Sequence, residues 1–122
     1  MIKMTLGELV IAEQEGALVE IAKLDLKIKD AIKLTKVLKQ VTEELSVFRQ
    51  VRDEKIKKYG VEKDGNIIIE PNSEHLDTFL AEIKEVQNNT LEFDFEPFEY
   101  EVIGDESKIS AKTLLLLNFL FV

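Results

Sequence analysis

The hydrophobic pattern is clearest between residues 28 and 60, where apolar side chains recur every three or four positions. The series is Ala31, Leu34, Leu38, Val41, Leu45 and Phe48, with Ile32, Val37 and Val51 beside it. This near-heptad spacing predicts a single helix of about 30 residues, roughly 45 Å long at 1.5 Å per residue. Lys57 and Lys58 complement the negative end of the helix dipole, and Gly60 is expected to end the helix in a left-handed conformation.

Shorter helices are predicted on both sides of this long one. Thr5 stands three residues before Glu8, which is the spacing of a capping box, so a helix is expected to begin there. Gly16 weakens the middle of the apolar stripe that follows, and a bend is expected at that residue. Ser73 is expected to start a third helix, which ends in the polar run at residues 87–90.

Two short strands are predicted in the second half of the chain. Residues 67–69 are three isoleucines that follow a turn at Asp64-Gly65 and stop before a proline. Residues 91–96 alternate apolar and acidic side chains, and the alternation changes phase at Pro97, which predicts a bulge or kink there. We expect residues 91–96 to pair with residues 66–70. The predicted fold class is therefore α+β and mainly helical, with a long central helix, shorter helices and a small two-stranded antiparallel sheet.

The length and composition predict a single domain over residues 1–122 with a modest core. The chain has no cysteine, which excludes disulfides and thiolate chemistry and suits a reducing cytoplasm. The net charge of −8 is uneven: residues 1–60 hold twelve basic and ten acidic side chains, whereas residues 61–122 hold four and fourteen. An acidic surface of this kind repels nucleic acid and favours cationic partners, so no nucleic-acid binding is expected.

Five acids of the alternating segment form a candidate docking face for a basic partner: Glu92, Asp94, Glu96, Glu99 and Glu101. The simpler interpretation is a solvated strand face. A metal site is disfavoured, because no loop has the calcium-binding pattern and His75 is the single histidine. The sequence also lacks the glycine-rich phosphate-binding motifs and the serine-nucleophile motif of hydrolases. We therefore predict no catalytic residue, no metal and no cofactor, and a protein that is not an enzyme.

The last ten residues are apolar on nearly every side, with Asn118 as the main polar exception. Ser107 or Ser110 is expected to cap a C-terminal helix of one to three turns. The run is far shorter than the roughly 20 residues that cross a bilayer, so no membrane partner is expected. A helix that is apolar all round must be covered on all sides, which predicts a homo-oligomer, most simply a dimer. The predicted interface consists of Leu114, Leu115, Leu117, Phe119, Leu120 and Phe121.

Several segments together resemble a family of small phage and prophage proteins. They are the start "MTLGEL", the lysine- and glutamate-rich long helix closing in "KKYG", the acidic alternating strand, and "ISAKTLLLLNFL" near the end. The chain departs from that family at its extreme C-terminus, where "NFLFV" stands in place of acidic residues. The resemblance implies a viral context, a location in the host cytoplasm or in the virion, and no particular activity.

Two function classes follow from these observations. The first is a non-enzymatic, self-associating protein that acts through protein–protein interaction in phage assembly or another step of the phage cycle. The alternative is an acidic inhibitor of a host defence or nucleic-acid-binding protein, because dense carboxylates can compete for a phosphate-binding surface.

Overall fold

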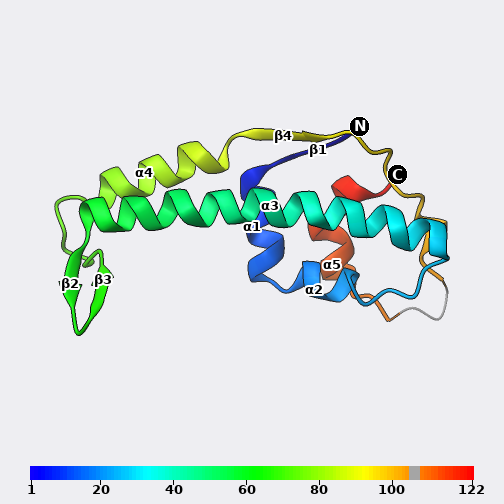
Figure 1. Ribbon diagram of the computed structural model, residues 1–122, viewed down its shortest axis with the longest axis horizontal. Coiled ribbons are helices and arrows are strands. Elements are labelled where there is room, and N and C mark those ends of the chain that lie inside the picture. The colour runs from blue at the N-terminus through cyan, green and yellow to red at the C-terminus, as the bar shows by residue number, and fades with distance from the viewer. Residues whose placement is uncertain (105–107) are drawn as a thin grey trace.

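The computed structural model describes residues 1–104 and 108–122, and it is organised around one long helix. Helix α3, Ile28–Tyr59, runs the length of the molecule, and the other elements lie along its two sides (Figure 1). Four residues of the predicted seam are buried, namely Leu34, Val41, Leu45 and Phe48, and so is Val37 beside it. Ala31 and Leu38 of the seam are only partly buried. The predicted α+β class, with a long central helix, shorter helices and small antiparallel pairing, is confirmed.

The end of α3 differs from the expectation in one respect. Gly60 is extended, with φ −87° and ψ 170°, so the predicted left-handed cap is wrong. Glycine is required there for space instead: a Cβ atom would lie 2.5 Å from the Ile56 carbonyl oxygen and 2.8 Å from Cγ2 of Ile67. The close approach lets the chain leave the helix directly into the following strand.

The N-terminal segment forms one strand and two short helices. Strand β1, Ile2–Thr5, runs into α1, Leu6–Gln14, and α2 follows at Ala17–Ile21. The capping box is confirmed, because the Glu8 backbone N–H donates to the Thr5 hydroxyl and the Thr5 N–H donates to the Glu8 carboxylate. The bend at Gly16 is also confirmed, and its φ of 78° explains why glycine stands between the two helices.

The strand pairing differs from the prediction. Strand β4, Thr90–Phe93, pairs antiparallel with β1, so that Ile2 faces Phe93 and Thr5 faces Thr90. The isoleucine segment instead forms a local hairpin, in which β2, Val61–Lys63, pairs with β3, Asn66–Ile68. The expected pairing of residues 91–96 with 66–70 is wrong, because the two-residue turn at 64–65 gives β3 a partner next to it in sequence. Asp64 and Gly65, at φ 52° and 82°, form that turn.

The acidic segment is a strand only in its first part. Its regular pairing stops at Phe93, and the chain then crosses to the C-terminal segment, where Phe98 makes an isolated bridge with Phe121. The Phe98 N–H donates to the Leu120 carbonyl at 2.7 Å. A 3-10 turn, η1, follows at Tyr100–Val102, so the second stretch of predicted alternation is not a strand.

Two helices complete the structure. Helix α4, Leu76–Gln87, begins three residues later than predicted, and the Ser73 hydroxyl accepts from the His75 N–H at 3.1 Å just before it. Helix α5, Ala111–Leu116, is capped by Ser110, whose hydroxyl accepts from the Thr113 N–H. A 3-10 turn, η2, Asn118–Leu120, closes the chain. The alternative cap, Ser107, lies outside the described residues.

The buried side chains are concentrated in one part of the molecule. Among the described residues, every buried side chain lies within residues 1–48 or 93–121. We call residues 1–48, 88–104 and 108–122 the body. Residues 49–87 comprise the last turns of α3, the β2–β3 hairpin and α4, and we call them the arm. No described residue of the arm is fully buried.

Candidate protein-interaction site

The C-terminal segment, predicted as an interface, is divided between core and surface. Leu117, Leu120 and Phe121 are buried in the core of this chain, so they are not available to a partner in this fold. They are buried because α5 packs on α1 and α2, and η2 lies against β1. Of the remaining predicted residues, Leu115 is 71% exposed, while Leu114 and Phe119 are partly buried.

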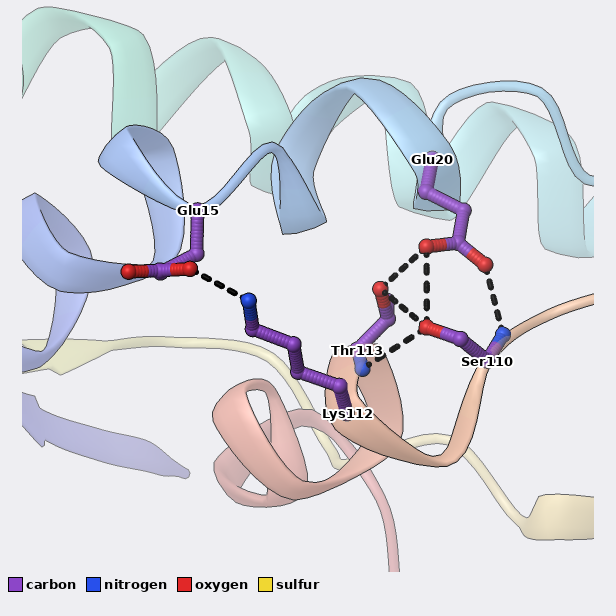
Figure 2. A network of polar contacts seen from close by, with 5 residues as sticks. All are labelled: Glu15, Glu20, Ser110, Lys112 and Thr113. Carbon is purple, nitrogen blue, oxygen red and sulfur yellow. Dashed lines mark hydrogen bonds and ion pairs between the residues drawn. The ribbon is translucent and has the colours of Figure 1, made fainter.

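A polar clamp holds α5 in this position. The Glu20 carboxylate, on α2, accepts hydrogen bonds from the Ser110 N–H at 2.6 Å, from the Ser110 hydroxyl at 3.1 Å and from the Thr113 hydroxyl (Figure 2). Lys112 pairs with Glu15 beside it. The hydrogen bond from Thr113, followed by that from the Ser110 backbone, holds the pKa of Glu20 below its ordinary value. Each side chain of the clamp has a partner within the chain, and the contacts of Glu20 join α5 to α2.

The five acids of the predicted docking face have unequal surroundings. All five are exposed. Glu92 pairs with Lys3 at 3.4 Å and Glu96 with the Met1 amino group at 3.7 Å, because β4 pairs with the basic start of the chain. In the described ranges, no ion pair is formed by the other three, Asp94, Glu99 and Glu101.

His75 has a surface position at the start of α4. Its ring lies 5.5 Å from the ring of Tyr59, and its side chain is half exposed. Within residues 1–104 and 108–122, no cluster of three or more histidine, aspartate or glutamate side chains is placed to hold a metal ion.

The arm contains its own polar cluster, which links α3 to α4. The Tyr59 hydroxyl donates to Glu82 at 2.7 Å, and Lys55 lies 3.0 Å from the other oxygen of that carboxylate. The hydrogen bond from Tyr59, followed by that from Lys55, lowers the pKa of Glu82, and the same carboxylate raises the pKa of Lys55. Each group has a partner inside the chain, so this cluster also serves to join two helices.

A groove between α2 and α3 is the most suitable place for a partner. It has a volume of about 430 Å³ and a mainly apolar lining: Leu18, Val19, Ala22, Leu38, Val41 and Leu45, with Thr42, Glu13 and Lys23 at its border. Val41 and Leu45 are buried at the base, whereas Val19 is 61% exposed at the edge. Glu13 is already paired with Arg49, so its charge at the border is compensated. The site is therefore an open hollow with an apolar base and polar edges.

The groove was not predicted from the sequence, although a signal was present. Residues 17–19 are three consecutive apolar side chains in a helix of only five residues. One helical face holds at most two of them, so one had to point away from the core. The bend at Gly16 decides which side of α3 the outward-pointing residue lies against. The hydrophobic periodicity alone does not give the geometry of that bend.

None of the helices in the described part of the chain is both long and apolar enough to cross a membrane. Comparison with known proteins gave no family model, no curated protein and no solved structure that matches this chain.

Proposed function

We propose that this chain is a non-enzymatic protein of the phage or prophage type that acts by binding other proteins. The observation that carries the proposal is the apolar groove between α2 and α3. Its base is supplied by the core side chains Val41 and Leu45, so the hollow is part of a packed structure. An apolar groove with polar edges suits the apolar face of an amphipathic helix, which anchors by side chains at i, i+3, i+4 and i+7. The viral context rests on the resemblance of the sequence segments.

The proposal is tested by capture from infected bacterial cells with tagged protein, comparing two matched surface variants. Val19→Lys places a charge at the edge of the groove, whereas Val47→Lys places one on α3 at a residue that does not line it. Both valines are more than half exposed, so both variants should fold, as thermal melts would verify. Partners retained by the wild type and by Val47→Lys should be lost with Val19→Lys. Equal capture by all three proteins would contradict the role of the groove.

A second candidate is a protein that docks on a basic surface of a host factor. The exposed acids Asp94, Glu99 and Glu101, without ion pairs in the described ranges, favour it. Partners of this type should be released when salt is raised from about 50 to 500 mM, since the Debye length falls from roughly 14 to 4 Å. They should also be lost with the triple variant Asp94→Asn, Glu99→Gln, Glu101→Gln. Partners that ignore both changes would exclude this candidate.

A further inference from the structure

The β2–β3 hairpin is the most exposed element of the arm. All eight residues from Val61 to Ile68 are exposed, and they include the apolar side chains Val61, Ile67 and Ile68. The hairpin projects from the far end of α3, on the side of that helix away from α4 (Figure 1). A two-stranded hairpin is marginally stable in water by itself, and it needs either a third strand or packing against a helix for stability. Here β3 contacts the end of α3, and this is the helix packing that supports the hairpin. This packing leaves all eight residues exposed, so the two-stranded sheet has room for a further strand.

The register of the hairpin shows which backbone groups are free. The two-residue turn makes Lys63 and Asn66 a hydrogen-bonded pair, so Glu62 and Ile67, the next pair, direct their N–H and C=O groups outward. In the part of the chain that the structure describes, no backbone group of a loop or helix forms a hydrogen bond with the N–H or the C=O of Ile67. The outer edge of β3 thus offers one donor and one acceptor at the same residue.

The two edges of the hairpin differ in charge. Strand β2 carries Glu62 and Lys63, which is the kind of charged edge that discourages pairing. Strand β3 is Asn66, Ile67 and Ile68, with no charge. If β3 met another β3 antiparallel about Ile67, the two Ile67 residues would exchange both backbone hydrogen bonds, and Asn66 would face Ile68. The same arrangement at β2 would place Glu62 opposite Glu62, which is unfavourable.

We infer that β3 is the self-association edge of this protein, and that two copies pair through it into a four-stranded antiparallel sheet. The order of strands is β2-β3 of one copy followed by β3-β2 of the other. The charged β2 strands then form both outer edges, so the sheet closes at two copies and does not extend. Main-chain hydrogen bonds supply the affinity in pairing of this kind. The surface is separate from the groove between α2 and α3, and a dimer could form whether or not the groove binds a partner.

The absence of cysteine from the chain makes a direct test possible. In the proposed dimer the Cα atoms of the two Ile67 residues lie about 5.5 Å apart, within the 4.4 to 6.8 Å that a disulfide spans. Mild oxidation of Ile67→Cys should therefore convert most of the protein into a covalent dimer. Glu62→Cys is the matched control, because it stands on the same hairpin opposite Ile67 but at the other edge. It should remain mostly monomeric under the same oxidation.

The noncovalent assembly is tested by light scattering over a range of concentration. The wild type should approach twice the monomer mass of 14.0 kDa at high concentration. Ile67→Lys should stay monomeric, because the two lysines would face one another, whereas Glu62→Lys should dimerise like the wild type. Circular dichroism melts would verify that all variants are folded. A monomeric wild type, or cross-linking of Glu62→Cys as efficient as that of Ile67→Cys, would overturn the inference.

Discussion

The body and the arm share the helix α3, but they are built in different ways. In the body, α3 is covered by α1, α2, the β1–β4 pair and the C-terminal segment, and most of its seam residues from Leu34 to Phe48 are buried. In the arm, the same helix has only α4 and a small hairpin beside it, and none of its residues is fully buried. The body can hold its shape by apolar burial, whereas the arm depends on partly exposed contacts and on the Tyr59–Glu82–Lys55 cluster.

The body and the arm should differ most in the free energy of unfolding that is lost when one leucine in each part is replaced by alanine. Leu9 is fully buried in the body and Leu80 is 53% exposed in the arm. Leu9→Ala should lower the free energy of unfolding by about 2 to 5 kcal/mol, because a cavity remains in a packed core. Leu80→Ala should change it by less than about 0.5 kcal/mol. Urea denaturation monitored by circular dichroism measures both, and equal losses would mean that the arm is as well packed as the body.

A smaller effect, confined to the arm, is expected at Gly60. In Gly60→Ala the new Cβ atom would press on the Ile56 carbonyl and the Ile67 side chain, so the hairpin must shift. The expected cost is about 1 to 3 kcal/mol, as for other overpacked positions. Hydrogen exchange should become faster in residues 61–68 and stay unchanged in α1.

The control for this change is Gly65→Asn in the turn of the same hairpin. Gly65 also has no side chain, but its surroundings are open and its φ of 82° is one that asparagine tolerates. The Gly65→Asn variant should show nearly the same hydrogen exchange in residues 61–68 as the wild type. If Gly60→Ala accelerated exchange in α1 as well, the arm and the body would unfold as one unit.

The smallest expected effect depends on pH and compares one carboxylate in each part. Glu20 in the body and Glu82 in the arm both have a lowered pKa. Each therefore contributes stability that is present above the ordinary glutamate pKa of about 4.3 and is lost as the pH falls through the lowered value. Glu20→Gln should lose this contribution at pH 7 already, and should approach the wild type as the pH falls toward 3.

Hydrogen exchange followed from pH 7 downward, corrected for its intrinsic pH dependence, distinguishes the two carboxylates. Glu20→Gln should reduce protection in α5, and Glu82→Gln should reduce it in α4, each without effect on the other helix. Wild-type and variant proteins whose protection differs by the same amount at every pH would contradict the assignment of the lowered pKa values to these contacts.

The helices could be predicted from the sequence because their signals are local. The seam of α3 and the capping box at Thr5 depend on spacings of three and four residues, and both are where the pattern placed them. The strand partners could not be predicted, since β1 is a four-residue alternation of Ile2 and Met4 with Lys3 and Thr5 that leads directly into a helix. Four residues are the shortest alternation that indicates a strand, and the alternation does not indicate which strand it pairs with.

The candidate site was harder to predict than the fold. The apolar composition of residues 114–122 predicted that this segment is covered on all sides, whereas Leu115 and Val122 are exposed in the structure. Composition also does not say what covers the rest. The structure places Leu117 and Leu120 in the core of the same chain and leaves an apolar groove elsewhere. The groove is lined by residues of α2 and α3, and the way two helices lie beside one another leaves no periodic mark in a sequence.

The clamp at Glu20 has a consequence for the rate of folding. Its hydrogen bonds join residues 90 and 93 positions apart, and β1 pairs with a strand almost as distant in the chain. Closing such large loops costs entropy before the stabilising contacts form. Proteins rich in distant contacts therefore fold more slowly than helical proteins whose contacts are local. We therefore expect α3 to form early, before the N-terminal and C-terminal segments pack on its apolar seam. During that interval the protein exposes more apolar surface than at any later time.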